Sequence, residues 1–197
     1  DILRIRYPEL KGKKIVLYLG RIHPKKGIGI LLEAFRKVIA QRDDVYLVIV
    51  GPVNNAYAKK IISLVNKESI LKKRVIFTGI LLGADKTGAF FASDIFILPS
   101  YGENFGIAAL EALACGLPVL LTKETGLSSD LKESGAGLII QRDALDISKN
   151  IERLLSNPDL RETMSSRGRE LARKRFDLEV AVNKMIGLYE SIAKRRL

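Results

Sequence analysis

The sequence contains only one cysteine and one histidine among its 197 residues. The cysteine, Cys115, lies in an apolar stretch, where a thiol behaves as a small buried hydrophobe, and it has no second cysteine for a disulfide. We therefore expect a reducing, cytoplasmic compartment. No His, Asp or Glu residues cluster at metal-ligand spacing, so the sequence predicts no metal site.

Long apolar runs are also missing. None approaches the roughly 20 residues of a membrane-spanning helix, and the start of the chain lacks the charged and then apolar pattern of a signal segment. With 47% hydrophobic residues, a chain of this length can bury the core of one ordinary domain. We expect one soluble domain over residues 1–197, as a fragment or processed product. Residues 1–14, with Pro8 and a dense mix of charges, are expected to be the remnant of a linker.

Acidic residues are outnumbered, because 22 Asp and Glu stand against 33 Lys and Arg, for a net charge of +11. This excess indicates an anionic partner or surface: nucleotide diphosphates, acidic lipids or nucleic acid. The basic clusters are spread along the chain, few aromatic residues lie among them, and no nucleic-acid-binding motif is present. We expect no specific nucleic acid partner. Charge alone leaves one alternative open, a non-catalytic anion-binding module that contacts nucleic acid or acidic membrane.

Strand-like and helix-like segments alternate along the chain. Short β-branched runs predict six buried strands, at 15–19, 45–50, 75–78, 95–98, 119–122 and 137–140. Helical spacing of apolar residues predicts helices at 28–41, 55–68, 85–92, 106–115, 144–155, 158–174 and 178–194. The alternation predicts an α/β fold, a Rossmann-like three-layer α/β/α domain with a central parallel sheet of about six strands and a helical C-terminal third. Ligands of such a sheet bind beyond the carboxyl ends of the strands.

Two cations flank the turn that follows the first predicted strand. This strand ends at Gly20 and Arg21, and Lys26 lies just before the first long helix. Backbone N–H groups and the positive helix end favour an anion in such a turn, and a guanidinium and an ammonium group can clamp two phosphates. On spacing alone, ordinary surface charges are an equal alternative. His23, between the two cations, is interpreted as a loop residue near the phosphates.

A second polar segment follows the fourth predicted strand. It leads into a helix near Gly106, and the free N–H groups of Asn104, Phe105 and Gly106 are expected to face an anion. Glu103 precedes this helix and Glu111 lies on it, so the two carboxylates are expected to contact different parts of one extended ligand. A carboxylate suits the vicinal hydroxyls of a ribose or sugar. A glutamate on a helix is more often solvated, but the apolar surroundings of Glu111 favour a carboxylate that needs a partner.

A nicotinamide-dependent oxidoreductase is a further alternative for an alternating α/β chain. Its fold requires a G-x-G-x-x-G turn directly after the first strand. Gly20, Gly27 and Gly29 have the wrong spacing for that turn. This function is therefore not supported.

Four segments carry a resemblance to a known family: GRIHPKKGIGILLEAF, VIVGP, VIFTG and GENFGIAALEALACGLPVL. Each is a weak signal alone, but all four lie at the ends of predicted strands and in the expected order. Together they resemble the group 1 retaining glycosyltransferases, which use nucleotide-sugar donors and have the GT-B fold. The resemblance covers nearly the whole chain as the C-terminal, donor-binding half, and the N-terminal acceptor-binding domain is expected to be absent.

The resemblance implies roles for the charged residues described above. Arg21 and Lys26 fall on the family's diphosphate-binding pair, Glu111 on the glutamate that holds the ribose hydroxyls, and Glu103 on the one near the transferred sugar. Arg21, Lys26 and Glu103 are the expected catalytic residues. Further donor contacts, largely through the backbone, are implied for Gly20, Ile80, Leu81, Asn104, Phe105 and Gly106.

The function implied by the resemblance is transfer of a hexose from a nucleotide-diphosphate sugar, of the GDP-mannose or UDP-glucose type, to a glycan or lipid-linked acceptor with retention of configuration. Cations and N–H groups that stabilise the leaving diphosphate make a divalent metal unnecessary, and no cofactor is expected. The acceptor would contact the missing N-terminal domain, so the isolated chain is expected to show little or no turnover. The basic charge favours an enzyme that works as a peripheral protein at the inner face of a membrane.

Overall fold

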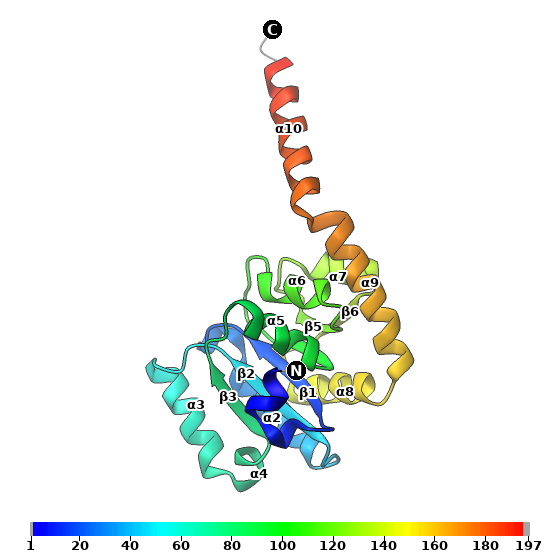
Figure 1. Cartoon of the computed structure of the whole chain (residues 1–197). Helices are drawn as coiled ribbons and strands as arrows, with labels where there is room; N and C mark the ends of the chain where they lie inside the picture. Colours follow the sequence, from blue (N-terminus) through cyan, green and yellow to red (C-terminus); the bar gives the residue numbers. More distant parts are fainter. Residues whose placement is uncertain (1, 195–197) are drawn as a thin grey trace.

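The computed structural model describes the backbone of residues 2–194 and, within that range, the side chains of all residues except 181, 193 and 194. The described residues form one sheet of six parallel strands in the order β3-β2-β1-β4-β5-β6 (Figure 1). This confirms the predicted Rossmann-like α/β architecture. The strands are β1 (Lys14–Leu19), β2 (Val45–Val50), β3 (Val75–Gly79), β4 (Ile95–Leu98), β5 (Val119–Thr122) and β6 (Gly137–Ile140).

The central strands are apolar on both faces because helices cover both sides of the sheet. Every residue of β2 is buried, and so are residues 15–18 of β1. The two strands pair in register from Lys14 opposite Val45 to Leu19 opposite Val50. Burial of such continuous apolar runs is the main stabilising contribution to a parallel sheet.

Helices connect and cover the strands. Right-handed crossovers put α2 and α3 on one face of the sheet and α5, α6 and α7 on the other. Helix α8 packs on α2, and α9 contacts α6, α7 and α8. The helices of the described residues are α1 (Ile2–Arg6), α2 (Ile28–Ile39), α3 (Ala56–Lys67), α4 (Ser69–Lys72), α5 (Gly83–Ala92), α6 (Ile107–Ala114), α7 (Ser128–Ser134), α8 (Ala144–Leu155), α9 (Pro158–Phe176) and α10 (Leu178–Lys194), with short 3₁₀ segments η1 (Pro8–Leu10) and η2 (Pro24–Lys26).

The order of the strands reverses between β1 and β4. These two strands lie side by side, with Val16 opposite Ile95. From β1 the chain proceeds to β2 and β3, whereas from β4 it proceeds to β5 and β6 on the other side. The loops that leave β1 and β4 therefore diverge, and in open α/β sheets this is where a ligand crevice forms.

The start of the chain is folded against the domain, although the sequence indicated a linker. Helix α1 packs on α5, and Leu3 and Leu10 are buried. Arg6 and Asp85 form an ion pair of 3.0 Å between the two helices. Two apolar side chains thus anchor a segment that looked irregular because of its charges. Helices α4 and α7 were also not predicted, because segments of four and seven residues show too little periodicity.

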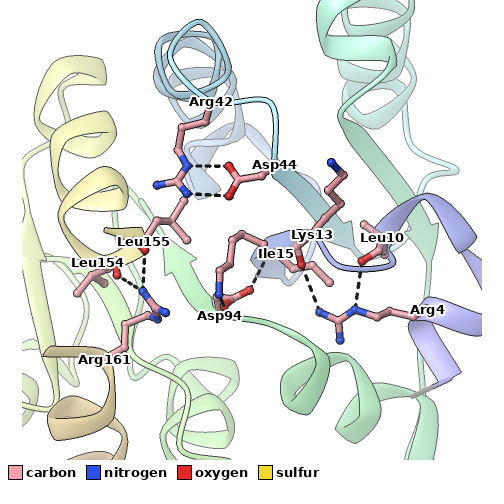
Figure 2. A network of polar contacts seen from close by, with 11 residues as sticks. Arg4, Leu10, Lys13, Ile15, Arg42, Asp44, Asp94, Leu154, Leu155 and Arg161 are labelled. Carbon is pink, nitrogen blue, oxygen red and sulfur yellow. Dashed lines mark hydrogen bonds and ion pairs between the residues drawn. The ribbon is translucent and has the colours of Figure 1, made fainter. Parts of the chain in front are cut away.

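Polar contacts join the elements at the amino-terminal ends of the strands (Figure 2). The carboxylate of Asp94, just before β4, accepts from the backbone N–H of Ile15 at 2.9 Å and from Nζ of Lys14 at 3.0 Å. Arg42 makes two hydrogen bonds to Asp44 at the start of β2, and these bonds hold the pKa of the Asp44 carboxyl below its usual range. These contacts tie the segments before β1, β2 and β4 together at the end of the sheet opposite to the carboxyl ends of the strands, where ligands of such folds bind.

Helix α10 extends from the end of α9, away from the sheet (Figure 1). Its main contact is with α9. Its apolar side chains are largely exposed, including Val182, Met185, Ile186 and Tyr189. The sequence predicted this helix over residues 178–194, and no described part of this chain covers its apolar side chains. None of the helices in the described range is both long and apolar enough to cross a bilayer.

We expect removal of residues 178–197 to leave the core almost as stable as before, because α10 buries little apolar surface in this chain. The free energy of unfolding, measured by urea denaturation, should change by less than about 1 kcal/mol. As a comparison, Leu113→Ala should cost about 2–5 kcal/mol, since Leu113 is 0% exposed. A truncation that costs as much as Leu113→Ala would show that α10 is part of the folded core.

Candidate functional site

Two loops meet at the open end of the sheet, one after β1 and one after β4. A cavity of about 260 Å³ lies between them. Its lining includes Gly20, Arg21, Lys26, Glu103 and Gly106. The structure therefore brings together, at the strand-order reversal, five of the residues that the sequence singled out.

Close backbone contact holds the two loops together. The carbonyl oxygen of Lys25 accepts from the N–H of Tyr101 at 2.8 Å and from the hydroxyl of Ser100 at 3.0 Å. Gly27 has a left-handed backbone with φ of 71°, and a Cβ atom there would lie 1.9 Å from the carbonyl oxygen of Pro99. Only glycine fits at this position, both for its φ and for the space available.

Tyr18, on β1, supports the turn that carries the first cation. Its phenol donates a hydrogen bond to the carbonyl oxygen of Arg21 at 2.8 Å. Burial, together with the nearby carboxylate of Glu103, raises the pKa of the Tyr18 phenol well above its usual value. The phenol therefore stays protonated and keeps donating. Sequence reasoning missed this residue, because an aromatic residue within an apolar strand carries no sign of a polar role.

Lys26 and Glu103 form an ion pair across the cavity. Their side chains are 13% and 21% exposed, so both charges are largely removed from water. The backbone on either side of Glu103 is fixed, because its N–H donates to the carbonyl of Glu124 and its own carbonyl accepts from the N–H of Gly126. Each charge partly offsets the desolvation of the other, and an unpaired charge here would be costly.

Helix α6 begins at the edge of this cavity. Gly106 is its N-cap, with φ of 92°, and provides no side chain to cap the helix. Among the described residues, the N–H groups of Ile107 and Ala108 therefore have no capping partner, and both residues line the cavity. Free N–H groups at the positive end of a helix make a binding position for an anion.

The residues just before α6 lie differently from the expectation. The cavity lining includes Glu103 and Gly106 but not Asn104 or Phe105 between them. The ring of Phe105 packs edge-on against Phe176 of α9, 5.4 Å between ring centres, and its carbonyl accepts from the N–H of Leu127. The helix starts one residue later than predicted, so its free N–H groups are shifted toward Ile107.

Glu111 lines a second and larger cavity, of about 560 Å³, rather than the one that contains Glu103. Leu110 and Ala114 of α6 and Arg173 of α9 also line this cavity. The carboxylate is half-exposed, and its Oε1 accepts from Nζ of Lys86 on α5 at 2.6 Å. The two glutamates thus lie at separate positions, Glu103 in the loop before α6 and Glu111 on the helix, as an extended ligand would require. The sequence predicted that Glu111 needs a partner but could not identify Lys86, which is 25 positions away.

The loop after β3 presents apolar side chains at the same open end of the sheet. Ile80 is 63% exposed and Leu82 is 75% exposed. Leu81, between them, is only 6% exposed and packs in the core. The side chains available to a ligand on this loop are therefore those of Ile80 and Leu82, and Leu81 could contribute only its backbone.

Comparison with known proteins decides the family. The model of the glycosyl transferases group 1 family matches residues 1–171. This chain belongs to the group 1 glycosyl transferases. It is 33% identical over 190 residues to phosphatidyl-myo-inositol mannosyltransferase of Mycobacterium leprae, covering 95% of this chain and 48% of that protein. The chain spans about half the length of the curated relatives that it matches.

Solved structures of glycosyl transferases have the same fold. The C-terminal domain of the group 1 protein LpcC from Francisella tularensis matches with a TM-score of 0.75 and 24% identity, covering 88% of this chain and 93% of that domain. HepE from Anabaena, in complex with UDP-glucose, matches with a TM-score of 0.83 and 24% identity, covering 96% of this chain and 51% of HepE. The predicted GT-B type and the position of the chain in the C-terminal half agree with these matches.

Within the described part of this group 1 glycosyl transferase chain, no three His, Cys, Asp or Glu side chains gather in a way that could hold a metal ion. His23 caps η2, where its Nδ1 accepts from the N–H of Lys25 at 3.2 Å. Its imidazole has a local structural role in this turn. The charged groups that converge on the smaller cavity are those of Arg21, Lys26 and Glu103.

The contact between Gly27 and Pro99 provides a direct test of how the site is held. Gly12 is a matched control, because it has nearly the same φ of 69° and a Cβ atom there would meet no other atom within 4 Å. We expect Gly27→Ala to lower the free energy of unfolding by at least about 2 kcal/mol more than Gly12→Ala, since only the first substitution forces the two loops apart. Equal losses in urea denaturation would contradict the importance of this contact.

Proposed function

We propose that this chain is the donor-binding domain of a retaining, metal-independent hexosyltransferase. The observation that carries the proposal is the convergence of Arg21, Lys26 and the free N–H groups of α6 on one cavity at the strand-order reversal. Such groups suit the diphosphate of a nucleotide sugar. Family membership favours glycosyl transfer over a non-catalytic anion-binding module.

The chemistry of transfer explains why cations gather here. Breaking the anomeric C–O bond develops positive charge on the sugar and negative charge on the departing diphosphate. Arg21, Lys26 and the start of α6 supply donors for that negative charge, which is the electrostatic task that a metal ion performs in other enzymes. Retention of configuration belongs to this proposal as an implication of the family resemblance.

The ion pair between Lys26 and Glu103 provides one group for the diphosphate of the donor and one for its sugar. When a diphosphate enters, the ammonium of Lys26 can exchange Glu103 for a phosphate oxygen, because both are ionised acceptors of charge-assisted hydrogen bonds. The carboxylate of Glu103 then becomes available to accept hydrogen bonds from hydroxyls of the sugar. Ground-state pairing of this kind keeps both charges stabilised while the site is empty.

The remaining parts of the donor would extend along α6. Glu111 lies one helical turn beyond Ile107 and would accept from the ribose hydroxyls, while exposed Ile80 and Leu82 would contact the base. We infer a donor of the GDP-mannose or UDP-glucose type. A mannosyltransferase relative and a structural neighbour solved with UDP-glucose support both classes.

In this proposal the acceptor and any general base belong to a second, acceptor-binding domain outside residues 1–197. A glycan or lipid-linked acceptor would be held between the two domains. The net charge of +11 supports work at an acidic membrane surface, where basic residues gain affinity from anionic lipids. Turnover at a normal rate by the isolated chain would contradict this division of roles.

Calorimetric titration tests the proposed donor site. The chain should bind one of UDP, GDP and ADP selectively, and EDTA should not change the affinity. Arg21→Ala and Lys26→Ala should each weaken binding roughly 10- to 100-fold, because a hydrogen bond to a charged group contributes about 1.5–3 kcal/mol. Lys60→Ala, on the exposed face of α3, is the matched loss of one positive charge and should change the affinity little. Equal weakening by all three variants would mean that only overall charge matters, and the donor site would be wrong.

A further inference from the structure

Lys86 forms an ion pair with Glu111, and no sequence motif identified it. It lies in the first turns of α5, and its ammonium donates to Oε1 of Glu111 at 2.6 Å. The two side chains are 31% and 36% exposed, so they are partly shielded from water. This ion pair links the start of α5, which follows the loop after β3, to the middle of α6.

The bonding pattern fixes the orientation of the carboxylate. Lys86 occupies Oε1, and among the described residues Oε2 of Glu111 has no protein donor. Asp85, the neighbour of Lys86, is bonded to Arg6 of α1 and so does not compete for the ammonium. One carboxylate oxygen is therefore held by the protein while the other is free to accept from a ligand.

Charge gives a second reason for the lysine. An unpaired carboxylate beside the proposed diphosphate would repel it, because like charges at short range in a partly buried site are unfavourable. The ammonium of Lys86 cancels the charge of Glu111 without removing its ability to accept hydrogen bonds. A glutamine could not replace this pair, because its amide presents one acceptor and one donor.

We propose that Lys86 is a positioning residue for Glu111: it neutralises the carboxylate and turns the free oxygen toward the vicinal hydroxyls of the ribose. This inference rests on the proposed function, since it assigns a nucleotide to the face of α6. Selection of ribose over 2′-deoxyribose then depends on an ion pair between two helices.

The first test compares ribonucleotides with their 2′-deoxy forms by calorimetry on the full chain. Wild type should bind its preferred nucleotide among UDP, GDP and ADP roughly tenfold more tightly than the 2′-deoxy form of that nucleotide. A tenfold difference in affinity corresponds to about 1.4 kcal/mol of binding free energy. Lys86→Met should lower the affinity for the ribonucleotide and abolish this preference. Lys86→Arg keeps the positive charge and should retain both the affinity and the preference. The control Lys60→Met should change neither. In a Glu111→Gln background, Lys86→Met should have no further effect on the preference.

A second readout does not depend on nucleotide binding. Cys115 lies one helical turn after Glu111 and is half-buried; burial and Glu111 raise the pKa of its thiol, and Lys86 lowers it. At a fixed pH, iodoacetamide should therefore react with this single cysteine more slowly in Lys86→Met and faster in Glu111→Gln. Unchanged rates in both variants would show that the cluster does not exist in solution and would overturn the proposal.

The outcomes separate the two proposals. If wild type binds none of the nucleotides, the proposed function is wrong, and the role of Lys86 toward ribose is overturned with it, even if the cysteine rates respond. If wild type binds but Lys86→Met retains the full ribose preference, only the role assigned to Lys86 is wrong.

Discussion

The site depends on the approach of two loops that leave neighbouring strands in opposite directions. The carbonyl of Lys25 accepts two hydrogen bonds from the loop after β4, and Gly27 lies so close to Pro99 that no side chain fits between them. This contact sets the distance between the turn that carries Arg21 and Lys26 and the segment that carries Glu103. Because both loops begin at buried strands, the sheet determines where the backbone carries these charged residues.

Partial burial of charged side chains has a cost in free energy, and the fold offsets it by pairing opposite charges. Lys26 pairs with Glu103, and Lys86 pairs with Glu111. Both pairs join elements that are distant in sequence, so each depends on correct folding of the domain. In both, a group that would bind the ligand is stabilised by protein while the ligand is absent. The buried phenol of Tyr18 has a similar effect on the backbone at Arg21, because it keeps its proton and its hydrogen bond.

Much of the fold and part of the candidate site could be predicted from the sequence. The features that could not be predicted were missed for physical reasons. The strands were predicted within one residue at each end because continuous apolar runs between glycine, proline and charges have few alternatives. Gly20, Arg21, Lys26, Glu103 and Gly106 were expected together because parallel strands open at one edge, and they line one cavity. Lys86 was missed because its partner is set by packing between α5 and α6, and Tyr18 was missed because an aromatic residue within an apolar strand carries no sign of a polar role. The packing of residues 2–10 against the domain was not foreseen, because their charges conceal the two buried leucines, Leu3 and Leu10.

A group 1 glycosyl transferase chain with this geometry should hold a diphosphate between the loop after β1 and the start of α6. The most direct measurement is a crystal structure of the chain with the tightest-binding of UDP, GDP and ADP. We predict phosphate oxygens in contact with Arg21, Lys26 and the N–H groups of Ile107 and Ala108, with the ammonium of Lys26 moved from Glu103 to phosphate. A nucleotide bound elsewhere, with the pair between Lys26 and Glu103 intact, would contradict the assignment of this cavity as the donor site.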